Sequence, residues 1–432
     1  MNRLQSHPAS KIQGEYSAPG DKSISHRLAM LGSLAEGTSQ FSHFLYSDDC
    51  KQTIEAFKAM GVSFQQKQTA EGDTLVINGV GLKGLSAPKK ELDLGNSGTT
   101  MRLLLGILAG QLFEAHLTGD ASLSRRPMRR VTKPLREMGA IIIGADDANY
   151  APLQIKGGKL KGISWKNEIA SAQVKSAILL AGLFAEGDTS VEEFFSSRDH
   201  TERLLIIFKA PFKKMNSKLI IRKTEKLSAV QFRVPGDISS AAFFIAAALI
   251  VPNSDLIVRQ VGLNPTRIGF LEALKLMGAD IKIEFKKDQG EPIGDIHVKS
   301  SRLKAIKLNQ NWIPKLIDEL PILMILCALA DGTSVIEGAE ELRIKETDRI
   351  HSMVAGLNAV GGKIEERHDG CVIEGVKGFA GGTISSFGDH RTAMSFLIAG
   401  LRSKEGIVAE DTDCIQTSYP GFENDLKRLS ER

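Results

Sequence analysis

The sequence predicts an α/β protein of two similar domains, each built from three βαβαββ units. The first observation is a turn rich in Gly, Asp or Ser followed by an apolar helix, which recurs six times in the 432 residues. Marker residues in these turns lie 76, 74, 66, 81 and 71 residues apart; they are Asp21, Ser97, Ser171, Asp237, Asp318 and Asp389. The second observation is that "APGDKSIS" at 18–25 and "VPGDISSA" at 234–241 share P-G-D-x-S across 216 residues, half of the chain.

A second helix and a pair of strands complete each unit. Segments such as "TIEAFKAMG" and "RIGFLEALKLMG" place apolar residues three and four apart and end on Gly, as helices do. Strand-like segments such as "TLVINGV" and "CVIEGV" follow and close on Gly turns. A short leading strand, "KIQGEYSAP", could pair with either domain. We expect an N-terminal domain over 19–236, a C-terminal domain over 1–18 and 237–432, and a ligand cleft between the domains.

The composition excludes several classes of protein. Hydrophobic residues make up 42% and charged residues 25%, as in soluble globular proteins. No apolar run approaches the roughly 20 residues of a membrane span, and the first residues lack the apolar core of a signal peptide. The four cysteines form no CxxC pair, which disfavours a zinc site and fits a reducing cytoplasm. A net charge of +4 and 6% aromatic residues do not indicate nucleic-acid binding.

Two cations stand at an unexpected place in the first repeat. The segment "GDKSISHR" puts Lys22 and Arg27 at the start of a helix, where partial positive charge disfavours cations by about 0.3–1 kcal/mol. The matching segment of the second half has Ile238 and Phe243 at these positions, so the fold does not need the cations. A helix start with free N–H groups, a hydroxyl and two cations predicts an anion site.

Other helix starts carry similar groups, although capping or solvation explains each of them equally well when it is taken alone. "LGNSGTTMR" is a nest of small residues, "SLSRRPMRR" is an arginine cluster, and "SSRDHTERL" precedes a helix that Thr201 is expected to cap. Asp318 and Glu319 open a helix, and Glu346 lies beside Lys345 and Arg349, like charges at i,i+4 that an anion would offset. Together these segments suggest that the cations at corresponding ends of the repeats lie close together in the fold. They are Lys22, Arg27, Arg126, Arg198, Lys345, Arg349 and Arg391.

Seven cations suit two small substrates with several negative charges. The sequence has no evident metal cluster, no dinucleotide fingerprint and no nucleophilic Cys/His pair. These features favour group transfer by positioning and electrostatics, without a metal or a cofactor.

The motifs "GDKSISHR", "GNSGTTMR", "RRPM", "SAQVKSA", "SRDHTE", "KETDR" and "GDHRTAM" resemble those of the 5-enolpyruvylshikimate-3-phosphate synthase family, in the same order and over nearly the whole chain. The resemblance implies two domains of three βαβαββ units each, an inside-out α/β barrel. It also implies transfer of the enolpyruvyl group of phosphoenolpyruvate to the 5-hydroxyl of shikimate 3-phosphate, with release of phosphate. That reaction passes through a tetrahedral ketal phosphate and belongs to the shikimate pathway to chorismate and the aromatic amino acids.

The resemblance also implies roles for individual residues. Shikimate 3-phosphate would be held by Lys22, Ser23, Arg27, Ser171, Ala172, Gln173, Arg198, Asp318 and Lys345. Phosphoenolpyruvate would be held by Lys22, Gly98, Arg126, Gln173, Arg349 and Arg391. Asp318 would accept the proton of the 5-hydroxyl, and Glu346 and Lys22 are candidates for proton transfer at the methylene carbon.

Two positions separate this chain from other family members, and a third position bears on inhibition. Ala172 stands where many members have a second Ser, as in the branch often called class II. Thr417 stands where others have a phosphoenolpyruvate-binding Lys. Gly98 is often Ala in members that resist glyphosate, so glyphosate is a candidate inhibitor here. We expect a cytoplasmic monomer that binds neither nucleic acid nor membrane.

Two alternative functions remain open at this stage. The related enolpyruvyl transfer to UDP-N-acetylglucosamine uses the same fold, but that relative has a reactive cysteine loop near "SLSRRPM", where this chain has no Cys. A non-catalytic binder of phosphorylated metabolites would keep the arginines and lose Asp318 and Glu346, and both are present.

Overall fold

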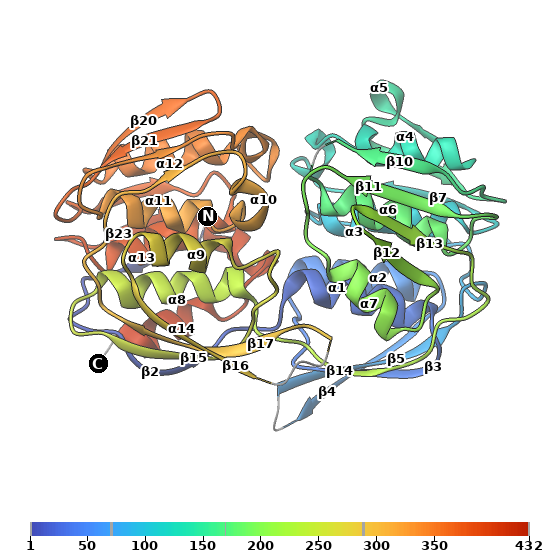
Figure 1. Ribbon diagram of the computed structural model, residues 1–432, viewed down its shortest axis with the longest axis horizontal. Coiled ribbons are helices and arrows are strands. Elements are labelled where there is room, and N and C mark those ends of the chain that lie inside the picture. The colour runs from blue at the N-terminus through green and yellow to red at the C-terminus, as the bar shows by residue number, and fades with distance from the viewer. Residues whose placement is uncertain (1, 70–71, 169, 287–289, 431–432) are drawn as a thin grey trace. The chain divides into compact units, whose positions relative to one another are not determined.

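The chain folds into two compact units. The computed structural model describes residues 2–69, 72–168, 170–286 and 290–430. Unit 1 comprises Met1–Pro19 and Pro235–Arg432, and unit 2 comprises Gly20–Val234 (Figure 1). The membrane search over the described residues found no helix with the length and hydropathy needed to span a bilayer.

Unit 2 contains three repeats of strand, helix, strand, helix and hairpin. The repeats comprise α1 (Lys22–Leu34), β3 (Glu36–Ser42), α2 (Asp48–Ala59), β4 (Ser63–Thr69) and β5 (Gly72–Val80); β6 (Leu92–Asp93), α3 (Gly98–Ala109), β7 (Glu114–Thr118), α4 (Arg129–Met138), β8 (Ile141–Gly144) and β9 (Tyr150–Lys156); and β10 (Ser164–Asn167), α6 (Ala172–Gly182), β11 (Thr189–Glu193), α7 (His200–Ile207), β12 (Phe212–Met215) and β13 (Lys218–Ile221). The first repeat takes its leading strand from the end of the unit, because β14 (Gln231–Arg233) pairs in parallel with β3.

Each repeat of unit 2 makes its own four-stranded sheet. The orders are β14-β3-β5-β4, β6-β7-β9-β8 and β10-β11-β13-β12. In each sheet the first two strands are parallel, and the hairpin of the last two strands is antiparallel. In the second and third repeats a crossover through the first helix, α3 or α6, connects the two parallel strands.

Unit 1 repeats this pattern with one difference. Its elements are β2 (Gln13–Ser17), α8 (Ile238–Ile250), β15 (Asp255–Gly262), α9 (Gly269–Leu276), β16 (Asp280–Lys286) and β17 (Ile293–Lys299); β18 (Lys307–Leu308), α10 (Ile313–Leu316), α11 (Leu320–Ala328), β19 (Thr333–Ile336), α12 (Arg349–Ala359), β20 (Lys363–Arg367) and β21 (Gly370–Glu374); and β22 (Gly382–Ser385), α13 (His390–Gly400), β23 (Ile407–Glu410) and α14 (Phe422–Ser430). The leading strand β2 pairs in parallel with β15, which places it in this unit.

The sixth repeat does not follow the expected βαβαββ order. Among the described residues its sheet has three strands, β1-β23-β22, and the third strand is β1 (Arg3–Ser6) from the N-terminal segment, antiparallel to β23. The final helix α14 has no hairpin after it within the described residues. The repeat read from the sequence marker Asp389 is therefore incomplete.

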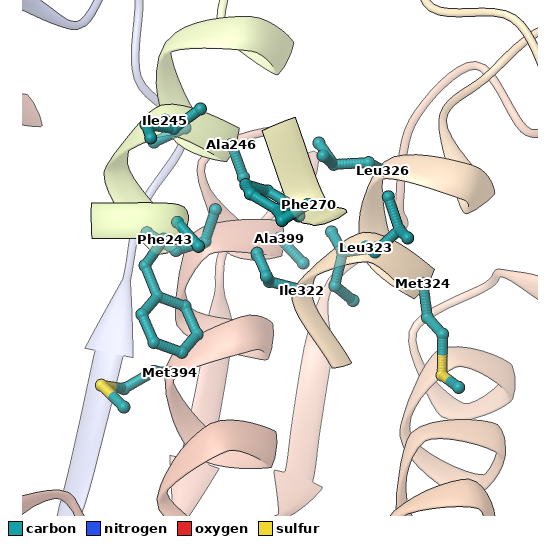
Figure 2. Close-up of a cluster of buried hydrophobic side chains, with 14 of the residues drawn as sticks. Phe243, Ile245, Ala246, Phe270, Ile322, Leu323, Met324, Leu326, Met394 and Ala399 are labelled. Atoms are coloured by element: carbon teal, nitrogen blue, oxygen red, sulfur yellow. The ribbon is translucent and has the colours of Figure 1, made fainter. Parts of the chain in front are cut away.

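One helix of every repeat lies in the core of its unit; these inner helices are α1, α3, α6, α8, α11 and α13. All nine residues of α11 and twelve of the thirteen in α8 are buried, as expected for helices that are apolar on all sides. Figure 2 shows this core around Phe243 of α8, Phe270 of α9 and Leu323 of α11. The sheets and the second helices pack around these inner helices.

Most of the sequence markers cap these inner helices. The Asp21 and Asp237 carboxylates accept from the backbone N–H groups of residues 24 and 239, at 2.9 and 3.0 Å, and Ser97 and Ser171 accept from residues 100 and 174. Asp389 accepts from residues 391 and 392 at 2.7 and 3.2 Å. Asp318 does not open its helix as expected: α11 begins at Leu320, and Pro321 occupies the first turn. That difference leaves Asp318 in a turn, where its side chain contacts cations.

Candidate functional site

In unit 2, Lys22 is the first residue of α1 and already has a carboxylate partner. Its Nζ lies 2.9 Å from Oδ2 of Asp49 on α2, and both side chains are more than four-fifths buried. The pair stands beside the positive end of α1, where an anionic ligand would be favoured. Lys22 is thus held in place before any ligand binds.

Arg27 joins three helices of unit 2. Its Nε donates to Thr201 Oγ1 of α7 at 2.7 Å, and its Nη2 donates to Ser176 Oγ of α6 at 3.0 Å. Its Nη1 donates to the carbonyl of Ser23 at 2.9 Å. The expectation that Thr201 caps α7 is wrong, because Asp199 occupies the N-cap position and the Thr201 hydroxyl faces Arg27.

Arg126 and the small residues of "GNSG" come together as one cluster. The Arg126 guanidinium donates to the Asn96 carbonyl at 3.2 Å and to the Asn96 side-chain oxygen at 2.5 Å. A Cβ on Gly98 would lie 3.2 Å from Nη1 of Arg126 and 3.0 Å from Nη1 of Arg102. Gly98 therefore leaves space directly beside two guanidinium groups.

Gln173 is oriented by a residue that the sequence reasoning missed. Arg102, on α3, donates from Nη1 to Gln173 Oε1 at 2.7 Å, and Gln173 Nε2 donates to Thr99 Oγ1 at 3.0 Å. Arg102 is buried, and it interrupts the otherwise apolar run "MRLLLG". An arginine inside a core helix was the signal available in the sequence.

His26 on α1 is linked to α2 and α3 through hydroxyl groups. Its Nδ1 lies 2.7 Å from Thr53 Oγ1, which lies 2.7 Å from Thr100 Oγ1, which in turn lies 2.7 Å from Ser97 Oγ. Burial, together with the charges of Lys22 and Arg27, lowers the pKa of His26 well below 6.5. The ring is therefore neutral at pH 7 and adds no charge to the cations around it.

Arg198 lies half-buried in the segment between β11 and α7, and Ser171 and Ala172 lie at the start of α6. Unit 2 therefore presents Lys22, Arg27, Arg126 and Arg198 on segments that adjoin the starts of its inner or second helices. Such a set of guanidinium and ammonium groups suits phosphate and carboxylate ligands.

In unit 1, Arg349 is a fully buried guanidinium with three carboxylate partners. Its Nε lies 2.8 Å from Asp389 Oδ2, its Nη2 lies 2.6 Å from Glu346 Oε2, and its Nη1 lies 3.4 Å from Asp318 Oδ1. Burial alone would lower the pKa of Arg349, but the charges of Asp389, Glu346 and Asp318 outweigh it and raise the pKa. Arg349 thus holds both carboxylates that the sequence suggested for proton transfer.

Asp318 has three cations near one carboxylate oxygen. Its Oδ1 lies 3.4 Å from Arg349 Nη1, 3.9 Å from Lys345 Nζ and 4.0 Å from Arg391 Nε. Arg391 also donates from Nη1 to the Asp318 carbonyl at 2.8 Å. The predicted i,i+4 repulsion of Lys345 and Arg349 on one helix is wrong, because Asp348 caps α12 and Lys345 precedes that helix. Both cations still reach Asp318.

Two further groups adjoin this part of unit 1. Glu319, interpreted from the sequence as an ordinary acid at a helix start, is fully buried; it accepts from Ser239 Oγ and lies 3.8 Å from Arg267 Nη2. Thr417 donates its hydroxyl to the Cys414 carbonyl at 2.7 Å and lies 3.2 Å from His390 Nδ1. The sequence contained no local signal for the Glu319–Arg267 pair, since 52 positions separate the two residues.

The two units offer different chemical groups to a ligand. Unit 2 offers cations and helix starts that bind anions, and unit 1 offers a carboxylate among cations, which can accept a proton and stabilise developing positive charge. The described residues hold no group of three or more His, Cys, Asp or Glu side chains arranged for a metal ion.

Comparison with known proteins assigns the chain to a family. The family model for EPSP synthase (3-phosphoshikimate 1-carboxyvinyltransferase) matches residues 6–426. The 3-phosphoshikimate 1-carboxyvinyltransferase of Geobacter metallireducens is 50% identical over 433 residues, covering 100% of both chains, and that of Desulforamulus reducens is 49% identical over 98% of both chains.

Solved structures agree with this assignment. The EPSP synthase of Acinetobacter baumannii superposes with a TM-score of 0.87 at 46% identity, covering 100% of this chain and 98% of that one. The enolpyruvyl transferase NikO of Streptomyces tendae has a TM-score of 0.78 at 15% identity, over 99% of this chain and 97% of that one, which shows a shared fold. With a family model that matches almost the whole chain and relatives at about half identity, the protein belongs to the EPSP synthase family.

Proposed function

We propose that this protein is a 3-phosphoshikimate 1-carboxyvinyltransferase, which transfers the enolpyruvyl group of phosphoenolpyruvate to the 5-hydroxyl of shikimate 3-phosphate and releases phosphate. The observation that carries the proposal is full-length identity of about half to relatives of that name. The site chemistry fits, because both substrates are polyanions and each unit collects guanidinium and ammonium groups. The proposal needs neither a metal nor a cofactor.

In unit 2, the proposal assigns the cations to substrate phosphate and carboxylate groups. Lys22, Ser23 and Arg27 at the start of α1, together with Arg198, bind shikimate 3-phosphate. Ser171, Ala172 and Gln173 at the start of α6 bind its ring and phosphate. Gly98, Arg126, Gln173 and Lys22 bind phosphoenolpyruvate. The fixed contacts of Arg27, Arg126 and Gln173 support these roles, because side chains that are already oriented lose less entropy on binding.

In unit 1, Asp318 accepts the proton of the 5-hydroxyl, and Lys345 lies beside that hydroxyl. Arg349 and Arg391 bind phosphoenolpyruvate, and Glu346 or Lys22 transfers the proton at the methylene carbon. An anion that binds Arg349 competes with Glu346 for the guanidinium, so substrate binding would free a carboxylate for proton transfer. The negative charges of Asp318 and Glu346 would also stabilise an oxocarbenium-like transition state.

The direct test is release of inorganic phosphate by the purified protein. We expect release only when shikimate 3-phosphate and phosphoenolpyruvate are supplied together, and no release from phosphoenolpyruvate alone. A protein that ignores this pair but turns over UDP-N-acetylglucosamine with phosphoenolpyruvate would contradict the proposal. Binding of both substrates without any turnover would instead identify a non-catalytic binder.

The proposal extends to the organisation of the enzyme. We propose that the two compact units are its two domains, and that it works as a monomer in the cytoplasm with no nucleic-acid or membrane partner. The P-G-D-x-S segment that recurs in the two halves of the chain supports the assignment of two domains. Light scattering of the purified protein should give the mass of a single chain.

Substitution of Gly98 tests the proposed phosphoenolpyruvate contacts and the role of glyphosate. In Gly98→Ala, the new methyl group meets the far ends of Arg102 and Arg126 at 3.0 and 3.2 Å, so both guanidinium groups must shift by a few tenths of an ångström. We expect KM for phosphoenolpyruvate and the inhibition constant of glyphosate to rise about tenfold, the equivalent of ~1.4 kcal/mol. Steady-state kinetics with both compounds measure the effect.

Gly158→Ala is the matched control for that experiment. A Cβ at Gly158 would have nothing within 4 Å, so this variant should behave like the unmodified protein. Gly98→Ala with unchanged KM and unchanged inhibition would show that phosphoenolpyruvate and glyphosate do not bind beside Arg126.

A further inference from the structure

Unit 2 contains a buried lysine, Lys175, that has no role in the proposed reaction. Lys175 stands in the first turn of α6, two residues after Gln173, and its side chain is 1% exposed. Its Nζ lies 2.7 Å from Glu202 Oε1 and 2.9 Å from Glu193 Oε2, and it donates to the Ser197 carbonyl at 3.4 Å. An ammonium group has three N–H donors, and here three acceptors surround it.

The electrostatics of this triad do not favour a role in stability alone. Burial by itself would lower the pKa of Lys175, but the charges of Glu202 and Glu193 outweigh it and raise the pKa, so the ammonium stays charged. Burial also raises the pKa of Glu202, although Lys175 opposes this change. Removing three charges from water costs several kcal/mol per ion, and apolar residues of the same size often stabilise such a site better. Stability alone therefore does not explain why one cation and two carboxylates are buried together here.

The three partners of Lys175 enclose the segment that carries Arg198. Glu193 is the last residue of β11, Ser197 directly precedes Arg198, and Glu202 is in the first turn of α7. Ser197 adds a second link, because its hydroxyl donates to Glu193 Oε1 at 2.5 Å. One ammonium thus connects both ends of the 194–199 connection to the helix that begins with Ala172 and Gln173.

The segment has few apolar contacts that could fix it by packing. Phe194 and Phe195, its two large apolar side chains, are 61% and 50% exposed. Hydrophobic burial therefore contributes little to the position of residues 194–196. The polar links of Lys175 to residues 193, 197 and 202 hold the segment, together with the pair of Asp199 and Arg203 at 3.0 Å. A change in those links would move Arg198 relative to the start of α6.

We propose that Lys175 is a positioning residue: its ammonium holds the Arg198 segment against the start of α6, so that Arg198 is preset for shikimate 3-phosphate. This inference rests on the proposed function. Lys175 touches no substrate group, and its effect on binding passes through Arg198. A side chain held in the bound geometry loses less entropy when the ligand arrives, which is how such an anchor contributes to affinity.

The test compares shikimate 3-phosphate binding by Lys175→Met, Arg198→Ala and the double variant, measured by calorimetry on the full-length protein. We expect Lys175→Met to raise the dissociation constant about 10- to 100-fold, the equivalent of ~1.4–2.7 kcal/mol. KM for phosphoenolpyruvate should change less than roughly threefold, a fraction of a kcal/mol. In the Arg198→Ala background, Lys175→Met should add almost nothing, since the two residues act as one unit.

Two controls separate positioning from lost stability. Leu205→Ala removes a fully buried side chain of α7, the helix that carries Glu202, but Leu205 is not part of the triad. The variant should be less stable and should leave the dissociation constant for shikimate 3-phosphate unchanged. Lys175→Met with Glu193→Gln and Glu202→Gln removes the unpaired buried charges, so it should fold even if the single variant does not. It should show the same loss of shikimate 3-phosphate affinity.

Three results would overturn the inference: unchanged affinity in the folded variants, equal losses in Leu205→Ala, or losses that add fully in the double variant. Failure of the proposed function looks different, because the unmodified protein would then fail to bind shikimate 3-phosphate at all.

Discussion

Replacing Asp318 by asparagine is expected to lower kcat by about 10²–10⁴-fold, the usual contribution of a general base. Asparagine keeps the size of the side chain and an oxygen toward Lys345, Arg349 and Arg391, but it cannot accept the proton of the 5-hydroxyl. The cations that hold the carboxylate remain in place. The dissociation constant for shikimate 3-phosphate should therefore stay within roughly threefold, well under 1 kcal/mol.

Single-turnover phosphate release and equilibrium binding together measure these two quantities. Asp348→Asn is the matched control, because Asp348 caps α12 three residues from Lys345 and asparagine caps helices equally well. That variant should keep a normal kcat. Weak binding with an unchanged kcat in Asp318→Asn would refute the role of proton acceptor.

The repeat and its helix starts were predictable because they follow local rules. Capping residues recur at Asp21, Ser97, Ser171, Asp237 and Asp389, and each accepts a backbone hydrogen bond within three residues of itself. Apolar periodicity likewise identified the inner helices, which the structure places in the two cores. Comparison of the two halves then separated the residues of the turn from the added cations, which no single segment could do.

The sequence did not predict which charged side chains form ion pairs with each other. Asp49 pairs with Lys22 across 27 positions, and Arg267 lies by Glu319 across 52, so neither contact leaves a local pattern. The prediction that Lys345 and Arg349 share a helix face was also wrong, because i,i+4 spacing indicates a shared face only when both residues lie in one helix. The cap at Asp348 starts α12 after Lys345, and that single local choice overrides the spacing rule.

Replacing Arg349 by methionine is expected to lower the free energy of unfolding of unit 1 by about 3–5 kcal/mol, the cost of leaving buried charges without their partner. Methionine matches the apolar stem of arginine but removes the guanidinium from Asp389, Glu346 and Asp318. Asp389 is fully buried and is bound to the first turn of α13, so it has no way to reach water without breaking its cap. The chain has two tryptophans, Trp165 in unit 2 and Trp312 in unit 1, so a Trp165→Phe background lets fluorescence report on unit 1 alone.

Arg343→Met is the control that separates buried from surface pairing in the same segment. Arg343 also has two carboxylate partners, Asp348 at 2.6 Å and Glu366 at 2.9 Å, but all three side chains are partly exposed. Arg343→Met should lower the free energy of unfolding of unit 1 by about 0–1 kcal/mol, as the loss of other surface ion pairs does. Equal urea midpoints for the two variants would show that burial does not distinguish these arginines and that Arg349 does not hold the carboxylates. A large difference would mean that one buried guanidinium both stabilises unit 1 and holds Asp318 and Glu346. The phosphoenolpyruvate binding that we propose for Arg349 would then use the same N–H groups.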